Sequence, residues 1–367
     1  MTSADEAQSA RKREGGAEAA LALGNRLLKE GRVAEAVVAF RDAIGQAPRF
    51  QAAHYNLGVA LRRARDWRSA ALAFREAARL DARDFDAMQN LVATLGDAVR
   101  AGEQPFPRAR APREGAGEPF SIVVCSVDRS RFARMRESFS AALAGRAHEF
   151  IVIDDASSLA EGYMRGLRQC RHERVVLAHD DIEIDADGAF DVMEQALEAQ
   201  DVVGLAGSRV ANGPAVMWAG HPHLHGWVAY PVAGASAFDA TIFSHESGLL
   251  GGMQTLDGML LATRRELALD VGFDAATFDG FHFYDLDFTY RAALRGLRLA
   301  VTTEVTVVHA SVGDFGDAWS HYAARFAARF PHLNAPAGPH HAYHTRLESR
   351  QSLSRFYEAL RGMAQLP

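Results

Sequence analysis

The sequence predicts an all-α repeat region followed by a mixed α/β domain. The first observation behind this prediction is a helical pattern near the N-terminus that repeats every 34 residues. The second is a downstream alternation of short β-branched runs with helical stretches, in which the apolar runs end in acidic residues. Strands joined by helices form a parallel sheet whose carboxyl ends meet at one edge, where α/β proteins bind their ligands.

Composition limits the possible classes of protein. With 367 residues, of which 48% are hydrophobic and 23% charged, the chain is globular and has room for two or three domains. A formal net charge of -6 argues against a nucleic-acid binder that works by neutralising phosphates. Two cysteines do not make a disulfide framework, so a reducing compartment is allowed. No apolar run reaches the ~18 residues that span a bilayer, and the polar N-terminus has no secretory core. We therefore expect a cytoplasmic protein without a transmembrane segment.

The repeat covers residues 17–84. Gly24 recurs as Gly58 and Phe40 recurs as Phe74, so small and large side chains keep their register. Each unit is expected to be a pair of helices, with glycine where helices approach closely and phenylalanine filling the gap; such units bury their apolar faces only by stacking. The pattern resembles the tetratricopeptide repeat, and the alternative is a helical bundle with accidental spacing. The resemblance implies a surface that binds a peptide or another protein.

Composition also suggests the boundaries of the domains. A run of Pro, Gly and charged residues without periodicity separates the repeats from the α/β region, as an interdomain linker does. The last part of the chain has the spacing of amphipathic helices, which we expect to pack on the α/β domain or on a second copy in a homodimer. The expected parts are a disordered N-terminus (1–16), helical repeats (17–100), a linker (101–119), the α/β domain (120–317) and C-terminal helices (318–367).

Polar side chains follow three runs that read as consecutive parallel strands, at 120–127, 149–155 and 174–181. Right-handed crossovers bring the ends of such strands to one edge of the sheet. Adjacent carboxylates repel each other unless a cation or a hydrogen-bond donor lies between them, so either a divalent metal with a phosphorylated ligand or a solvated strand end explains the acidic pairs. The chain lacks a Gly-x-Gly-x-x-Gly or Walker phosphate loop, which leaves a metal to neutralise phosphates. The side chains expected in one crevice are Ser126, Asp128, Asp154, Asp155, Asp180 and Asp181.

These strand ends resemble three motifs of family-two nucleotide-sugar glycosyltransferases, which have the GT-A fold. The segments are Ser121-Ile-Val-Val-Cys-Ser-Val-Asp128, Ile151-Val-Ile-Asp-Asp-Ala-Ser157 and Val175-Val-Leu-Ala-His-Asp-Asp181. The resemblance implies a UDP-, GDP- or dTDP-sugar donor and a bound Mn²⁺ or Mg²⁺, which stabilises the charge that develops on a diphosphate leaving group. The roles it implies are nucleoside contacts for Ser126, Asp154 and Asp155, a ribose or sugar contact for Asp180, and metal binding for Asp181.

The chain departs from this family pattern at two places near the strand ends. His179 stands where the family usually has an acid, and Tyr163-Met-Arg-Gly166 replaces the usual Arg-Asn-x-Gly. The preferred nucleotide is therefore not implied. His179 is either a direct ligand or a neutral imidazole bonded to nearby backbone.

Three later segments extend the resemblance. The Asp257-Gly-Met segment is similar to one that lies beside the donor sugar, and the segment around Asp285 is similar to the family's Glu-Asp-x-Asp, with Tyr284 in place of the Glu. This implies that Asp285 is the base that accepts the acceptor's proton during inverting transfer. Asp287 is expected to support the helix start or Arg291.

His309 ends another apolar run and resembles the histidine that completes the family's metal shell; the alternative is a hydrogen-bonded core histidine. The residues after it, 311–316, are expected to form a mobile loop that closes over the donor. The alternating His221, His223 and His225 superficially suggest zinc. Because acidic or cysteine ligands are missing at a suitable spacing, a sugar- or acceptor-binding loop is favoured there.

The sequence thus predicts a metal-dependent inverting glycosyltransferase. It would move a sugar from a nucleotide sugar to a glycan or protein acceptor, with the repeats recruiting the acceptor or a partner. The alternative is a protein-binding repeat scaffold fused to a catalytically silent glycosyltransferase fold.

Overall fold

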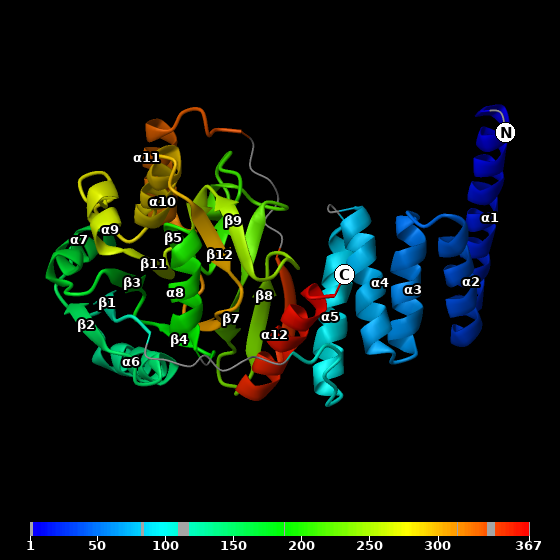
Figure 1. The fold of residues 1–367 in the computed structure, drawn as a ribbon, viewed down its shortest axis with the longest axis horizontal. Helices are drawn as coiled ribbons and strands as arrows, with labels where there is room; N and C mark the ends of the chain where they lie inside the picture. The colour runs from blue at the N-terminus through cyan, green and yellow to red at the C-terminus, as the bar shows by residue number, and fades with distance from the viewer. Residues whose placement is uncertain are drawn as a thin grey trace. The chain divides into compact units, whose positions relative to one another are not determined.

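The computed structural model describes residues 3–81, 84–108, 117–186, 188–313, 315–335 and 342–366. The chain divides into two compact units, the first formed by Met1–Arg108, Tyr343–Thr345 and Glu358–Pro367, the second by Ala109–Ala342 and Arg346–Tyr357 (Figure 1). Part of the expected linker, residues 109–116, lies outside the described residues. A search of the described helices finds none with the length and apolar character needed to cross a membrane.

Five helices form the N-terminal part of the first unit, and they confirm the predicted all-α region (Figure 1). The second and fourth helices begin 34 residues apart, and so do the third and fifth. The first helix begins at Ser3, so residues 3–16, for which disorder was expected, are helical. The helices are α1 (Ser3–Lys29), α2 (Val33–Gln46), α3 (Gln51–Arg63), α4 (Trp67–Leu80) and α5 (Phe85–Arg100).

The repeated glycines and phenylalanines meet each other, as the sequence predicted. A Cβ atom added at Gly24 would lie 2.4 Å from the Phe40 ring, and one added at Gly58 would lie 2.8 Å from the Phe74 ring. Real Cβ atoms do not tolerate such distances, so the helices can approach this closely only because glycine occupies both positions. The same contact therefore recurs with the period of the sequence.

The second unit is built on a mixed sheet of seven strands in the order β2-β1-β3-β11-β5-β12-β9. Strand β1 is parallel to both β2 and β3, which agrees with the predicted βαβαβ alternation. Antiparallel β11 lies between β3 and β5. The strands are β1 (Phe120–Cys125), β2 (His148–Ile153), β3 (Arg174–Ala178), β5 (Val202–Gly204), β9 (Leu249–Met253), β11 (Leu260–Arg264) and β12 (Leu299–Thr302).

The second unit also contains a second sheet. Its strands follow the order β10-β6-β7-β13-β4, and β8 (Phe238–Ile242) pairs with β7. Strand β6 follows β5 closely in the chain, but the two strands belong to different sheets. The remaining members are β4 (Ile182–Ile184), β6 (Ala206–Ser208), β7 (Leu224–Pro231), β10 (Thr255–Leu256) and β13 (Val307–His309).

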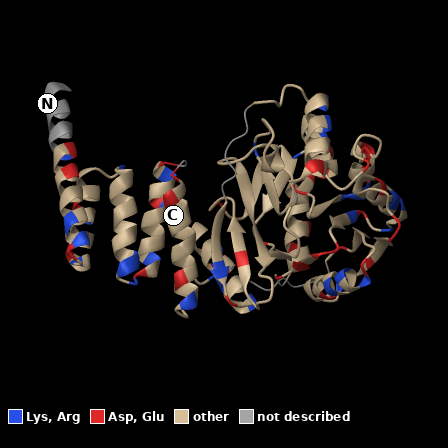
Figure 2. Cartoon of the chain, turned by 180° about the vertical axis from the view of Figure 1, so that it is seen from behind, with Lys and Arg blue, Asp and Glu red and all other residues tan. Residues whose placement is uncertain are grey.

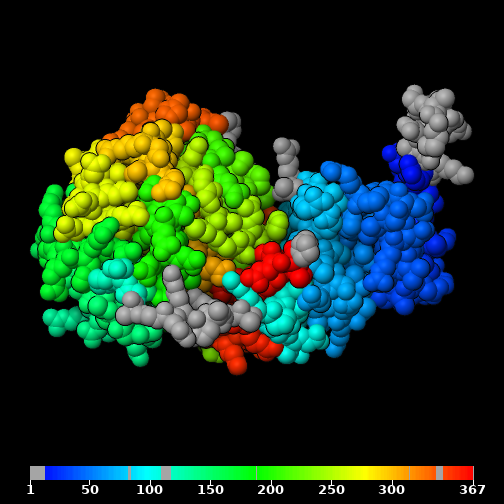
Figure 3. Space-filling model, viewed as in Figure 1, coloured from blue at the N-terminus to red at the C-terminus, as the bar shows by residue number. Residues whose placement is uncertain are grey.

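Helices cover the sheets of the second unit, and charged side chains gather on helices and loops, whereas β1, β5 and β12 carry none (Figure 2). The surfaces of α10 and α11 adjoin each other (Figure 3), because Trp319 and Phe326 pack on Phe283, with ring centroids 5.3 and 5.6 Å apart. The helices are α6 (Arg129–Leu143), α7 (Leu159–Gln169), α8 (Ala189–Ala199), η1 (Val216–Trp218), α9 (Arg265–Val271), α10 (Tyr284–Leu294) and α11 (Asp317–Arg329).

The C-terminal part differs from the two helices that the sequence suggested. Helix α11 is followed by a strand, β14 (Tyr343–Leu347), and then by α12 (Arg350–Ala364). Side chains in β14 alternate between buried and exposed, which is the period of a strand and not of a helix. The C-terminal helices expected over 318–367 are therefore interrupted by a strand at Tyr343–Leu347.

Candidate active site

Two histidines and an aspartate gather beyond the carboxyl end of β3. His179 and Asp181 follow β3, and His309 ends β13; one possible ligand atom from each lies within 4.8 Å of the others. His309 Nε2 is 3.2 Å from Asp181 Oδ1. Strand pairing explains this approach, because β13 is antiparallel to β4 with His309 opposite Ile182, the neighbour of Asp181.

The protonation states of His179 and Asp181 suit a cation. Burial, together with the neighbouring His309, lowers the pKa of His179 to about 4, although Asp257 and Asp181 raise it. Burial raises the pKa of Asp181, but the contacts with His309 and Ser311 outweigh it and hold this pKa well below its usual range. A neutral imidazole and an ionised carboxylate are the forms that bind metals.

The donor set fits Mn²⁺ better than Mg²⁺. Imidazole nitrogen and carboxylate oxygen together suit transition-metal ions, whereas Mg²⁺ prefers oxygen ligands and retained water. The site thus offers two nitrogens, from His179 and His309, and oxygens from Asp181.

Tyr284, at the start of α10, fixes the orientation of His179. Its hydroxyl donates to the carbonyl of Gly258 over 3.3 Å, and His179 Nε2 lies 2.8 Å from the same hydroxyl. A hydroxyl has one proton to donate. With that proton on the Gly258 carbonyl, His179 Nε2–H would donate to the Tyr284 oxygen and Nδ1 would keep its lone pair. His179 and Tyr284 each stand where the family motif usually has an acid, and their side chains contact each other.

Asp285 lies beside Tyr284 and is bound to the same loop. Its Oδ2 accepts a hydrogen bond of 2.7 Å from the Gly258 backbone N–H. A Cβ atom at Gly258 would lie 2.2 Å from the Tyr284 hydroxyl and 2.7 Å from Asp285 Cβ, so this close approach requires glycine. Burial, and next the negative charge of Asp257, raise the pKa of Asp285 to about 7, against the opposing effect of backbone N–H groups.

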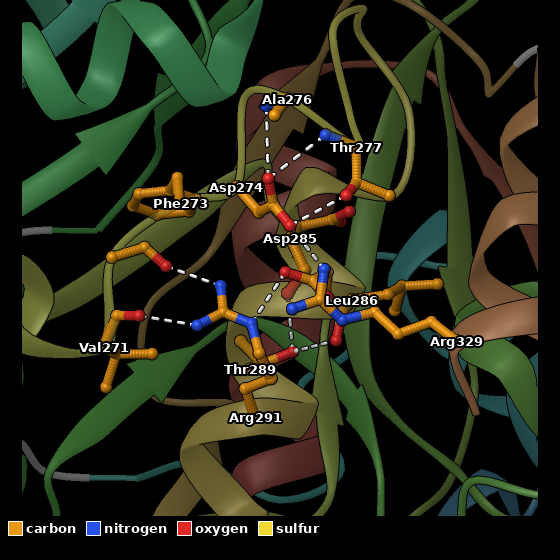
Figure 4. A network of polar contacts seen from close by, with 12 residues as sticks. Val271, Phe273, Asp274, Ala276, Thr277, Asp285, Leu286, Thr289, Arg291 and Arg329 are labelled. Atoms are coloured by element: carbon orange, nitrogen blue, oxygen red, sulfur yellow. Dashed lines mark hydrogen bonds and ion pairs between the residues drawn. The ribbon is translucent and has the colours of Figure 1, made fainter.

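A buried ion network anchors the first turn of α10 behind Asp285 (Figure 4). Asp287 is fully buried and accepts from Arg291 Nε at 2.8 Å, while Arg329 Nε of α11 lies 3.2 Å from it. Arg291 also donates to the carbonyls of Val271 and Gly272. The predicted support of Arg291 by Asp287 is confirmed, and the network ties α10 to α11 and to the end of α9.

The other predicted site residues lie at the ends of neighbouring strands. Ser126 follows β1, and its hydroxyl donates to Asp180 Oδ2 over 2.7 Å. Burial raises the pKa of Asp180 despite this bond. Asp154 and Asp155 follow β2 and are exposed, and Asp155 pairs with Arg165. The edge of the sheet thus brings these groups to the same side as the histidine cluster.

Asp128, another predicted site residue, also stabilises the start of a helix. Its Oδ1 accepts from the backbone N–H groups of Ser130 at 2.8 Å and Arg131 at 3.1 Å, so it caps the N-terminus of α6. These bonds, with one from the Ser130 hydroxyl as the largest effect, lower the pKa of Asp128.

Comparison with known proteins identifies the family to which this chain belongs. The profile of a family described as glycosyltransferase-like matches residues 121–330, more than half of the chain. The chain belongs to this glycosyltransferase-like family. The predicted glycosyltransferase class and GT-A domain are thereby confirmed. No curated protein matches the chain.

Solved structures similar to this glycosyltransferase-like chain are distant. A mannosyltransferase from Pyrobaculum calidifontis, solved with GDP-Man and Mn²⁺, is 14% identical over 81% of each chain with a TM-score of 0.37. GalNAc-T7 with UDP, GalNAc and Mn²⁺ is 10% identical over 66% of this chain and 54% of its own, with a TM-score of 0.37. An O-GlcNAc transferase variant from Thermobaculum terrenum is 19% identical over 37% of this chain, with a TM-score of 0.21. The chain spans only 30% of that last protein.

The sequence did not assign all residues of this glycosyltransferase-like site. For His179 the sequence left open a direct ligand and a neutral imidazole bonded to backbone; in the structure its side chain lies beside Asp181 and contacts the Tyr284 hydroxyl. The His225 of the histidine triplet is buried, with Nδ1 3.2 Å from the Ser244 hydroxyl and 3.7 Å from Glu246. Among the described residues, the group of possible metal ligands consists of His179, Asp181 and His309, and the triplet is not part of it.

Proposed function

We propose that this chain is a metal-dependent inverting glycosyltransferase that moves a sugar from a nucleotide-sugar donor to a hydroxyl of a glycan or protein acceptor. One observation carries the proposal. The histidine–aspartate cluster and Asp285 are joined through two residues, since His179 binds Tyr284 and both Tyr284 and Asp285 bind Gly258. A cation site and a carboxylate with a pKa near neutrality thus share one rigid frame.

We propose that the bound ion is Mn²⁺. Mg²⁺ is the alternative, but it binds histidine nitrogens less readily than Mn²⁺ does. His179, Asp181 and His309 are proposed as its ligands. When bound there, a divalent ion stabilises the negative charge of the departing nucleoside diphosphate.

Asp285 is proposed as the general base. Its carboxylate takes the proton of the acceptor hydroxyl while the acceptor oxygen forms a bond to the anomeric carbon. The bond from that carbon to the diphosphate oxygen breaks, and the electron pair leaves with the nucleotide. A base works best when its pKa lies near the operating pH, and the pKa of about 7 meets this condition. The Gly258 N–H holds one carboxylate oxygen in place.

The donor is proposed to lie along the edge formed by β2, β1 and β3. Ser126, Asp154 and Asp155 would contact the nucleoside, and Asp180 the ribose or sugar. Asp257 would lie beside the donor sugar; its carboxylate accepts from the Met259 N–H at 2.9 Å. Asp128 would act by fixing the start of α6 next to this edge, as its capping bonds support. The helical unit is proposed to bind the acceptor or a protein partner, which its repeat pattern supports.

Donor turnover by the purified full chain tests this proposal. UDP-, GDP- and dTDP-sugars would be incubated with the chain and Mn²⁺, Mg²⁺ or a chelator, and released nucleoside diphosphate would be measured. We expect one donor class to be hydrolysed slowly without an acceptor, with Mn²⁺ best and chelator abolishing it. Asp181→Asn should remove this activity, whereas exposed His321→Ala on α11 should keep it. Failure to bind or hydrolyse any of these donors with either metal would contradict the proposal.

A further inference from the structure

Tyr230 lies beside the histidine–aspartate cluster, and no step of the proposed transfer uses it. It is the last residue but one of β7, which runs parallel to β13 with Ala229 opposite Val308. Tyr230 and His309 are the next residues of these two strands, and their ring centroids lie 6.1 Å apart with the ring planes tilted by 34°. Neighbouring residues on paired strands point to the same face of a sheet. The Tyr230 side chain therefore lies on the same face as His309.

The Tyr230 hydroxyl is available to a ligand. The side chain is only partly buried, and its hydroxyl has no hydrogen-bond partner among the residues that the structure describes. Two other hydroxyls of the site are engaged, because Ser126 donates to Asp180 and Tyr284 donates to the Gly258 carbonyl. Tyr230 thus offers an O–H donor that no contact within the described chain uses.

Asp257 lies near this hydroxyl and offers an acceptor. Its negative charge raises the pKa of Tyr230, after the larger effect of burial, and it also acts on His179 and Asp285. Asp257 Oδ1 accepts from the Met259 backbone N–H at 2.9 Å, which leaves Oδ2 as an acceptor. A sugar hydroxyl both donates and accepts, so it can bind Tyr230 and Asp257 together. A phosphate oxygen only accepts, and the carboxylate would repel its charge.

The order of the strands places Tyr230 away from the nucleoside. Strand β13 lies between β4 and β7, so Asp181, just before β4, and Tyr230 lie on opposite sides of His309. Asp181 also follows β3 closely, and β3 belongs to the edge proposed to hold the nucleoside. A donor whose diphosphate lies at the cluster therefore directs its sugar toward Tyr230. We propose that Tyr230 donates a hydrogen bond to a hydroxyl of the transferred sugar, which in turn donates to Asp257. The inference rests on the proposed sugar transfer and adds a residue that selects the sugar.

Titration calorimetry of the full chain with Mn²⁺ separates a contact with the sugar from one with the nucleotide. The probes are UDP-glucose, GDP-mannose and dTDP-glucose, each compared with its free nucleoside diphosphate, and the pair that the unaltered chain binds most tightly is used throughout. Tyr230→Phe keeps the ring and removes only the hydroxyl. We expect it to weaken binding of the nucleotide sugar about three- to tenfold and to leave the affinity for the free nucleoside diphosphate unchanged. With monodeoxy forms of the same donor, this loss should vanish at the position whose hydroxyl Tyr230 contacts.

Tyr55→Phe is the matched control. Tyr55 lies in α3 of the helical unit, is also partly buried, and accepts a hydrogen bond from Asn90 over 3.2 Å. Its replacement should leave both affinities unchanged, and the thermal unfolding midpoint of each variant confirms that it is folded. Equal affinity of Tyr230→Phe and the unaltered chain for the nucleotide sugar, an equal loss with the free nucleoside diphosphate, or a loss that persists with every deoxy donor would overturn this inference alone. Absence of binding of all six probes to the unaltered chain would contradict the proposed function as well.

Discussion

The ionisation of Asp285 should set the pH dependence of sugar transfer. Its pKa is raised to about 7, first by burial and then by the charge of Asp257. A general base acts only when ionised, so activity rises with pH through this value. With a single such group, roughly a tenth of the molecules are active at pH 6 and roughly nine-tenths at pH 8. We therefore expect kcat/KM to increase about tenfold over this interval.

Two substitutions separate this explanation from a general effect of pH. Asp257→Asn removes the neighbouring negative charge, so the pKa of Asp285 should fall and the rising limb should move to lower pH, whatever happens to the absolute rate. Asp285→Asn should lower kcat/KM by about 10²–10⁴-fold and abolish the limb. Asp270→Asn removes an exposed carboxylate at the far end of α9, which pairs with Arg295 at 3.2 Å, and should leave the limb in place.

The assay is initial-rate nucleotide release at constant ionic strength, with Mn²⁺ shown to be saturating at each pH. That condition matters because metal binding also depends on pH. A limb that stays at the same pH in Asp257→Asn, or that persists in Asp285→Asn, would refute the assignment of Asp285 as the base.

Three further substitutions test the frame around the site and the repeats. Gly258→Ala should reduce activity at least about tenfold, because the new methyl group overlaps α10 at its first turn, and initial rates with the same donor measure this. Asp287→Ala should lower the free energy of unfolding by about 3–5 kcal/mol in chemical denaturation, since it leaves two arginines without their buried partner. Gly58→Ala should destabilise the helical unit by about 1–3 kcal/mol, because the methyl group overlaps a buried ring.

Each of these changes has a matched control in the chain. Gly251→Ala places a methyl group 3.7 Å from its nearest neighbour and should keep activity, and Gly45→Ala in α2 meets nothing within 4 Å and should leave stability equal or higher. Glu266→Ala breaks only an exposed contact of 3.9 Å with Arg265 and should cost less than about 1 kcal/mol. Equal effects in a variant and its control would contradict the packing and burial arguments.

The parts of the fold that sequence could predict are those with a regular local signal. The 34-residue period located the helices, and three apolar runs located the first three strands, the first followed by Ser126, the second by Asp154 and Asp155, and the third by Asp180 and Asp181. The start of α10 was predicted from the acidic residues in its first turn. These features depend on neighbours in the sequence, so the sequence displays them directly.

Other features depend on pairing between distant segments. Strand β4 has only three residues, which is too short for a clear pattern in the sequence. The break between β5 and β6 depends on the different sheets that the two strands join. Strand β14 did carry a signal in the sequence Tyr343-His-Thr-Arg-Leu347, where the polar His344 and Arg346 alternate with residues that the structure buries. The contact between His179 and Tyr284 was not predicted, because 105 residues separate the two positions. Both positions depart from the family motif, and such joint departures are a signal for contact.

Binding of Mn²⁺ to the purified full chain, followed by electron paramagnetic resonance, tests the central claim most directly. In the presence of the nucleoside diphosphate of its donor, the unaltered chain should bind Mn²⁺ at one site. His179→Ala, Asp181→Asn and His309→Ala should each weaken that binding about tenfold or more, while exposed His321→Ala should bind as the unaltered chain does. Equal Mn²⁺ affinity in all four variants and the unaltered chain would contradict a metal site at the end of β3.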